Sequence, residues 1–344
     1  MPSSDLAPNK LPKVVLHEHL DGGLRLDTLF DLLQGRGLTV PAPDPARLAV
    51  WFTANAHAGS LEKYLEGFAL TVAAMATPAA LRRVAFEAAE DSLADGAVLA
   101  EYRIAPLLFE AHGVSGEAAV EALLEGLAES ALPSGLIVCG MRHLPPTETL
   151  RAARLALRYQ GRGVVGFDLA GPERGHPADE HIEALRLLLD AGLPLTLHAG
   201  EADSAERVLQ AGRLGAKRIG HGVRLVDAMH DARSSSLVEE AKAMGLHLEV
   251  CPTSNVHTGA AESIATHPIT ALWRAGVSVS YHTDNRLMSC ITQSSEAAAL
   301  LKYTPLTEAD LLGMAVEAAR HSFLPQAQRQ AALAHIEAFA VLPG

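Results

Sequence analysis

The stretch Lys13-Val-Val-Leu-His17-Glu-His19-Leu-Asp21-Gly-Gly23 decides the fold class that we predict for this chain of 344 residues. Its apolar start predicts a strand over residues 13–17, and the strand runs into a polar turn. An open, doubly wound sheet would favour a glycine-rich phosphate turn at this point, with the spacing G-x-G-x-x-G. That spacing is absent, so the stretch favours a closed barrel.

Seven more strand-like runs follow, and amphipathic helical patterns lie between them. The eight predicted strands are residues 13–17, 98–104, 136–142, 164–169, 194–198, 217–220, 247–251 and 277–283. This alternation predicts an α/β fold, a (β/α)8 barrel of the TIM type. Additional helices are expected after the first strand, near residues 26–34 and 61–75, and at the C-terminus, near residues 308–320 and 326–338. No linker-like segment interrupts the pattern, so we expect a single domain over residues 1–344.

The charge balance and the apolar runs narrow the possible partners. Acidic residues outnumber basic ones by 40 to 28, which gives a formal net charge of −12. Nucleic-acid phosphates attract the opposite sign, and aromatic residues that could stack on bases make up only 4% of the chain. No apolar run approaches the roughly 18 residues that a membrane span needs. We therefore expect neither a nucleic-acid partner nor a membrane partner.

The N-terminus and the cysteines suggest the cellular compartment. The first ten residues are polar and lack the apolar core of a signal peptide. Three widely spaced cysteines, Cys139, Cys251 and Cys290, form no C-x-x-C pair and no even-numbered disulfide framework. A reducing, cytoplasmic location is expected.

His17 and His19 are the first candidate metal ligands. They lie two residues apart at the end of the first predicted strand, and residues i and i+2 share a face of a strand. Both imidazoles can therefore reach one metal ion. A single H-x-H pair is equally typical of two solvated loop histidines, so further ligands are needed.

Further polar residues follow other predicted strands, where barrel active sites are built. His198 ends the fifth strand, His221 follows the sixth, and Asp284 follows the eighth. Three of these four histidines, together with the carboxylate, would form a site of nitrogen and oxygen ligands with room for water, as in catalytic zinc centres. Each residue alone could instead bond a loop carbonyl, but their joint placement favours the metal site.

Glu201 is a candidate proton donor. It follows His198 by three residues, and Gly200 permits a tight backbone just before it. A carboxylic acid beside a metal site can donate or shuttle protons. The alternative is a helix-start residue, because acidic groups favour helix N-termini.

Several motifs of other enzyme classes are missing. Cytidine-type zinc deaminases carry H-x-E with P-C-x-x-C, whereas this chain has Val250-Cys-Pro-Thr253 without a second cysteine nearby. The chain also lacks H-E-x-x-H, a P-loop and G-x-S-x-G. A metal-assisted hydrolase of another type remains.

Five motifs, in order, resemble the adenosine deaminase family of the amidohydrolase superfamily. They are His17-x-His19-Leu-Asp21-Gly, Gly166-Phe-Asp-Leu-Ala-Gly171-x-Glu173, His198-Ala-Gly-Glu201, Arg218-Ile-Gly-His221-Gly and Thr283-Asp284. The resemblance extends over about residues 12–320. It implies a hydrolase that deaminates adenosine, and 2'-deoxyadenosine as well, to inosine-type products and ammonia.

The resemblance also implies roles for individual residues. One Zn²⁺ ion per chain would be held by four ligands: His17, His19, His198 and Asp284. Glu201 would protonate purine N1, and His221 would hold the attacking hydroxide. The substrate would be a small-molecule purine nucleoside, contacted by His19, by Asp21 at the ribose 5'-hydroxyl and by Gly171 at purine N3. Alternatives that remain are adenine or aminodeoxyfutalosine as substrate, and a zinc- and nucleoside-binding protein without catalysis.

The chain departs from the family pattern at two positions. Asn285 stands where many members have a second aspartate that contacts purine N7, but an amide can also donate a hydrogen bond to N7. His282 stands where asparagine is usual, and strand alternation directs it away from the side of Asp284, which predicts a structural role. Glu101 and Arg103 also fit the family, and we interpret them as a structural ion pair.

Overall fold

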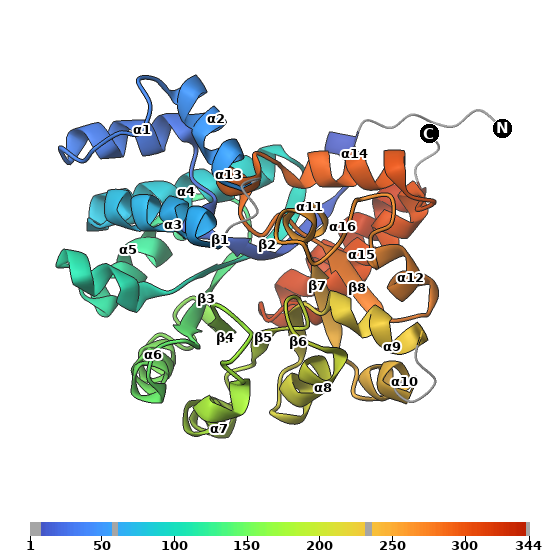
Figure 1. Ribbon diagram of the computed structural model, residues 1–344. Helices are drawn as coiled ribbons and strands as arrows, with labels where there is room; N and C mark the ends of the chain where they lie inside the picture. The colour runs from blue at the N-terminus through green and yellow to red at the C-terminus, as the bar shows by residue number, and fades with distance from the viewer. Residues whose placement is uncertain (1–7, 57–60, 231–235, 342–344) are drawn as a thin grey trace.

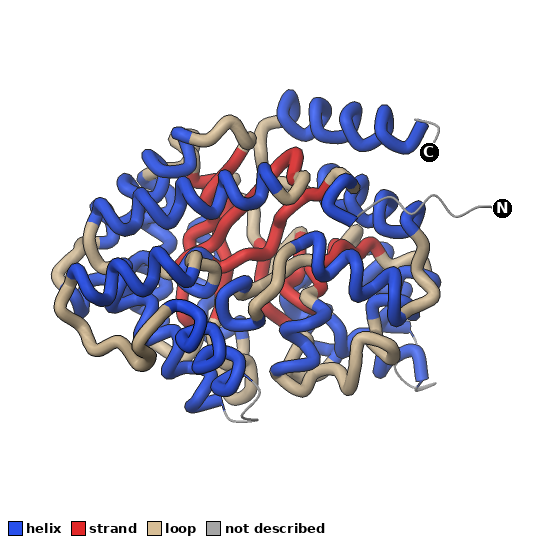
Figure 2. Tube along the Cα trace, turned by 90° about the horizontal axis from the view of Figure 1, so that it is seen from above, coloured by secondary structure: helices blue, strands red, loops and turns tan. Residues whose placement is uncertain are grey.

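Parallel strands form the centre of the structure, and helices surround them (Figure 1 and Figure 2). The computed structural model describes residues 8–56, 61–230 and 236–341. In this part of the chain the strands are β1 (Lys13–His19), β2 (Ala97–Ile104), β3 (Ser134–Met141), β4 (Val164–Ala170), β5 (Thr196–Ala199), β6 (Arg218–His221), β7 (His247–Val250) and β8 (Ser278–Tyr281). They pair in the orders β1-β2-β3-β4 and β5-β6-β7-β8.

Isolated bridges connect the two four-stranded sheets at both edges. Phe167 of β4 bridges to Leu195, just before β5, and Glu18 of β1 bridges to Asp284, just after β8. The amide of His19 donates to the carbonyl of Asp284 at 2.8 Å. These contacts bring the sheet edges together, in agreement with the predicted (β/α)8 barrel.

The predicted strands differ from the observed ones by two residues or fewer at either end. The difference at β1 matters most, because this strand continues to His19 and so carries both histidines of the H-x-H pair. On the outer side of β1, Val14 and Leu16 pack in an apolar cluster with Ala315 and Ile336. Because side chains alternate along a strand, His17 faces the barrel interior.

Helices cover the outside of the barrel. Those of the repeating strand and helix units are α4 (Pro78–Ala94), α5 (Gly116–Glu129), α6 (Pro146–Arg158), α7 (Ile182–Asp190), α8 (Ala205–Arg213), α10 (Ser236–Ala243) and α12 (Ile269–Arg274). The interval after β1 contains α1 (Leu26–Gly35), α2 (Pro45–Ala56) and α3 (Leu61–Met75), and the C-terminal part contains α14 (Gln293–Tyr303), α15 (Glu308–His321) and α16 (Gln326–Val341). The helices α1, α3, α15 and α16 are therefore present where the sequence predicts them, and α2 and α14 are found in addition.

Short helices after the strands complete the rim. They are α9 (Asp227–His230), α11 (Pro252–His257) and α13 (Arg286–Ser289), together with the 3₁₀ turn η2 (Leu20–Gly22). The sequence patterns do not predict α2, α9, α11, α13 or α14. Of these, α9, α11 and α13 have only four to six residues, which give too few repeats of the 3.6-residue period to be recognised.

In the described part of the chain, no helix combines the length and the apolar character that crossing a membrane would require.

Candidate functional site

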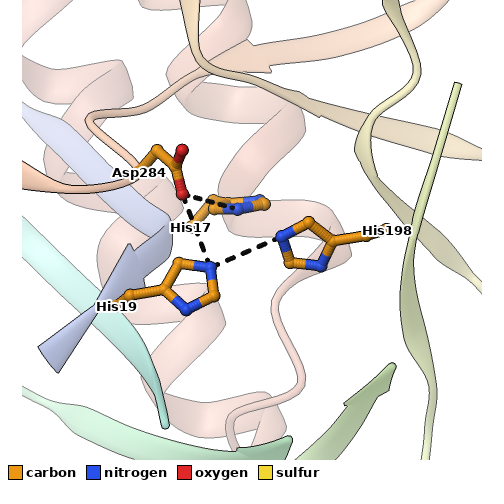
Figure 3. A group of neighbouring side chains, drawn as sticks. All are labelled: His17, His19, His198 and Asp284. Atoms are coloured by element: carbon orange, nitrogen blue, oxygen red, sulfur yellow. Dashed lines mark hydrogen bonds and ion pairs between the residues drawn. The ribbon is translucent and has the colours of Figure 1, made fainter. Parts of the chain in front are cut away.

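Four side chains at one rim of the barrel point toward a common centre (Figure 3). They are His17, His19, His198 and Asp284, and their ligand atoms all lie within 4.8 Å of one another. Two come from β1, one from β5, and Asp284 from the segment directly after β8. The structure thus brings together the four residues that the sequence predicts as metal ligands.

A carboxylate orients the ring of His17 from the side that faces away from Asp284. Its Nδ1 lies 3.0 Å from Oε2 of Glu249, and an ionised carboxylate accepts the Nδ1 proton. Its Nε2 is buried without a hydrogen-bond partner and lies 3.3 Å from Oδ1 of Asp284. Two facing acceptor atoms of this kind fit a shared cation.

His198 is oriented in the same way from the opposite side of the centre. Its Nδ1 lies 2.9 Å from Oδ2 of Asp168, so Nε2 faces inward. That Nε2 is 3.4 Å from Nε2 of His19, which is also 3.4 Å from Asp284. Burial lowers the pKa of His19 well below its usual value, so its imidazole is neutral, the form that binds metal.

Buried charges inside the barrel hold the two orienting carboxylates. Arg103 donates to Oδ2 of Asp168 at 2.9 Å and to Oε2 of Glu249 at 2.5 Å. Arg218 lies 2.6 Å from Oε1 of Glu249. Burial alone would raise the pKa of Glu249, but Arg103 and Arg218 hold it well below its usual value. Glu249 is therefore ionised and fixes the His17 ring.

The predicted ion pair between Glu101 and Arg103 is wrong. Arg103 pairs with Asp168 and Glu249, whereas Glu101 pairs with Arg218 at 2.7 Å. Neighbours two apart on a strand point the same way into the barrel, where facing strands supply closer partners. Sequence periodicity within one strand carries no information on those partners.

Two residues of the site have a left-handed backbone. The φ angles of Asp284 and His221 are 59° and 66°. Such strain in residues other than glycine persists where the surroundings enforce it, often at functional sites. Ser254 of α11 donates to Oδ2 of Asp284 at 2.6 Å, which leaves Oδ1 for the two β1 histidines. Burial alone would raise the pKa of Asp284, but His17 holds it well below its usual value.

Glu201 lies in a tight loop after β5. The expected tight backbone at Gly200 is confirmed by its φ angle of 68°. The carboxylate of Glu173 accepts backbone hydrogen bonds from residues 200–203, at distances from 2.6 to 3.1 Å. Glu173 therefore fixes the loop, and it places Oε2 of Glu201 3.6 Å from Nε2 of His221.

His221 connects this loop to the metal-ligand group. Its ring centroid lies 4.8 Å from that of His17 and 5.3 Å from that of His198. Burial lowers the pKa of His221, so its ring is neutral. Glu201 and His221 thus lie together beside the four candidate ligands, as the sequence predicts.

The predicted substrate contacts lie on segments that follow the strands. Asp21 is in η2, and its Oδ1 is buried without a hydrogen-bond partner. Burial raises the pKa of Asp21 to about 7. Gly171 follows β4 with a φ angle of 94°. Asn285 is buried against Gly22, where a Cβ atom would lie only 2.0 Å from Oδ1 of Asn285.

His282 is not part of the ligand group. Its Nδ1 accepts a hydrogen bond from the amide of Leu16 at 3.3 Å, and its Nε2 lies 2.6 Å from Oγ of Ser280. Both ring nitrogens therefore bond inside the barrel, which agrees with the predicted structural role.

This chain matches known proteins along nearly its whole length. The family model described as "Adenosine deaminase" matches residues 12–339. An adenosine deaminase of Mycobacterium bovis (strain BCG / Pasteur 1173P2) is 42% identical, over 97% of this chain and 96% of the relative. The chain belongs to the adenosine deaminase family. Another family member, from Mycobacterium ulcerans (strain Agy99), is 40% identical over 94% of this chain and 93% of its own length.

Solved structures of a deaminase and of an amidohydrolase share the fold. Adenine deaminase from Arthrobacter aurescens has a TM-score of 0.86 at 23% identity and covers 96% of this chain and 100% of its own. A cog1816 amidohydrolase from Burkhoderia ambifaria with bound Zn has a TM-score of 0.83 at 23% identity, covering 97% of this chain and 92% of its own. The predicted barrel fold is confirmed.

Several residues of the site are not found by sequence reasoning. Asp168 and Glu249 orient histidines, and Ser254 and Asn255 on α11 contact site residues. A charged residue within an otherwise apolar strand is the signal that could indicate Asp168 or Glu249. For the α11 residues, Pro252 marks a helix start but nothing in the pattern places that helix at the site.

Proposed function

We propose that this chain catalyses the hydrolytic deamination of adenosine, and of 2'-deoxyadenosine, to the corresponding inosine and ammonia. The observation that carries the proposal is the position of Glu201 and His221 beside a compact group of three histidines and Asp284. The relatives at 40 to 42% identity are named adenosine deaminases. A carboxylic acid, an imidazole and a metal-ligand set are the groups that hydrolysis at a purine C6 requires.

We propose one Zn²⁺ ion per chain, held by His17, His19, His198 and Asp284. Three nitrogen ligands and one oxygen ligand suit zinc, and the buried Nε2 of His17 without a partner fits a metal-facing atom. A zinc ion would lower the pKa of bound water from about 15.7 toward 7, which supplies a nucleophile at neutral pH.

The residues of the chain would supply the proton transfers. Asp284 and His221 orient the attacking water, and a carboxylate oxygen of Asp284 accepts its proton. Glu201 donates a proton to purine N1 as the ring loses aromaticity on attack at C6. Asp284 then passes its proton to the 6-amino group and the C6–N bond breaks, which releases ammonia. The proton of the added hydroxyl returns to Glu201 as the C6 carbonyl forms. Binding must be tightest for the tetrahedral species between substrate and product.

Features of single residues support the substrate contacts that we propose. The unpartnered Oδ1 of Asp21 fits a hydrogen bond from the ribose 5'-hydroxyl, and the backbone of Gly171 fits purine N3. Asn285 donates its amide to N7, and His19 lies between the metal site and the substrate. The partner is thus a small purine nucleoside. Three free cysteines agree with the reducing, cytoplasmic location that we propose.

A substrate panel tests this function. Purified protein loaded with zinc is incubated with adenosine, 2'-deoxyadenosine, adenine and aminodeoxyfutalosine, and ammonia release is measured. We expect the highest kcat/KM for adenosine or 2'-deoxyadenosine. A higher value for adenine or aminodeoxyfutalosine would assign another 6-aminopurine as substrate. Binding of adenosine without ammonia release would instead support a protein without catalysis.

Asn285 is expected to donate a hydrogen bond to purine N7. In 7-deazaadenosine the acceptor is missing, and a buried amide left without its partner costs about 1 to 3 kcal/mol. This corresponds to a roughly 5- to 150-fold lower kcat/KM than for adenosine. Asn285→Ala should narrow this gap, since the donor is then absent for both substrates. If the ratio of the two kcat/KM values stays the same in the variant, Asn285 does not contact N7.

A further inference from the structure

Asn255 contacts both of the proposed proton-handling residues at once. It lies on α11 and is fully buried. Its Nδ2 donates to Oε1 of Glu201 at 3.1 Å and lies 3.1 Å from Nδ1 of His221. A side-chain amide has two N–H groups on this nitrogen, and two acceptors lie within reach of them.

The contact determines where the proton of His221 resides. The Nδ2 group of an amide only donates, so Nδ1 of His221 must be the acceptor. A ring nitrogen that accepts a hydrogen bond carries no proton, so the imidazole of His221 has its one proton on the other nitrogen. That proton is therefore on Nε2, the nitrogen that lies 3.6 Å from Oε2 of Glu201. His221 can then donate to the attacking oxygen, while Asp284 is left as the acceptor of its proton.

The same contact determines which oxygen of Glu201 carries the acid proton. Oε1 accepts from Asn255 and, at 2.8 Å, from Oγ1 of Thr258. A carboxylate oxygen has two lone-pair sites, and two donors fill them. A proton on Glu201 must therefore be on Oε2.

We propose that Asn255, assisted by Thr258, is a positioning residue that directs the acid proton of Glu201 to Oε2 and the ring proton of His221 to Nε2. The inference rests on the proposed deamination, because it assigns the proton that purine N1 receives. Asn255 acts through Glu201 and His221. Without it, either side chain can rotate and present an atom without a proton to the substrate.

Two variants remove these donors. Asn255→Asp keeps the shape of the side chain but has no N–H group, and Thr258→Val removes a hydroxyl from an exposed residue where folding is not at risk. Thr266→Val is a matched control, because its hydroxyl bonds only within an exposed loop, at 2.9 Å from Ser263. Zinc content and melting temperature are recorded for each protein.

The experiment measures how strongly the binding of an inhibitor depends on its purine N1 atom. Inhibition constants are measured for purine riboside, which has N1, and for 1-deazapurine riboside, which has a C–H group there. We expect the wild-type preference for purine riboside to fall roughly 10- to 100-fold in Asn255→Asp, the range for residues that orient a site. In Thr258→Val it should fall several-fold, and in Thr266→Val it should not change. For adenosine, kcat should fall while KM stays within about threefold.

The inference is overturned if the preference for purine riboside is unchanged in Thr258→Val and in Asn255→Asp, or if Asn255→Asp retains its full kcat, since the amide would then not act as a donor. If Asn255→Asp does not fold, the Thr258→Val result decides alone. A wild-type protein that neither deaminates adenosine nor binds the two ribosides would refute the proposed function instead. An active wild type with unaffected variants would refute only the role of Asn255.

Discussion

Asp284→Ala is expected to lower kcat/KM for adenosine by roughly 10³-fold or more, the scale seen when one member of a catalytic group is removed. Asp284 supplies the single oxygen of the candidate ligand set, and its Oδ1 lies 3.3 Å from His17 and 3.4 Å from His19. The variant keeps three histidines, so it retains weak metal binding but loses the carboxylate that orients the attacking water. Its zinc content after dialysis against a chelator should be far below one per chain.

Ser254→Ala provides the matched comparison. It removes only the hydroxyl that donates to Oδ2 of Asp284 at 2.6 Å and leaves the carboxylate in place. We expect a loss of roughly 10- to 100-fold, between the wild type and Asp284→Ala. Both effects are measured as kcat/KM together with elemental analysis. Full activity of metal-free wild-type protein would contradict the assignment of all four ligands.

The candidate ligands could be predicted because each position follows from the pattern of its own strand. The H-x-H spacing on one strand requires only side-chain alternation, and the observed β1 carries both histidines. His198 and Asp284 could be predicted because the C-terminal ends of parallel strands meet at one rim. The bridge between Glu18 and Asp284 brings the first and last strands together there.

The network behind the ligands could not be predicted for the opposite reason. Glu249 bonds His17 across 232 positions of sequence, and Arg103 reaches Glu249 across 146. Such partners depend on which side chains face one another inside the barrel. The incorrect pairing of Glu101 with Arg103 has this origin, because it assumed that neighbours on one strand satisfy each other.

The residues on α11 could not be predicted for yet another reason. Helix α11 has only six residues, and its position over the site depends on the path of the loop after β7. Ser254 and Asn255 reach Asp284 and Glu201 only because of that path. Pro252, directly after the predicted strand, is typical of a helix start, but it does not predict the direction that the helix takes.

Glu201→Gln is expected to lower kcat for adenosine by roughly 10²- to 10⁴-fold, the range for loss of a general acid. Glutamine keeps the shape and can accept from Asn255 and Thr258 as the carboxylate oxygen Oε1 does. Its amide can hydrogen-bond to purine N1, but it cannot transfer a proton there. Substrate binding is therefore retained while the chemical step fails, so KM should change by much less than kcat.

The metal content of Glu201→Gln separates the acid from the ligands. Glu201 belongs to a loop fixed by Glu173, and its carboxylate is not in the group of side chains that faces the proposed zinc. The variant should therefore retain about one zinc per chain, in contrast to Asp284→Ala. Because the two variants are both expected to be nearly inactive, only this contrast distinguishes loss of a proton donor from loss of the metal. Zinc loss in Glu201→Gln, or equal changes in kcat and KM, would show that Glu201 supports the metal site rather than protonating the substrate.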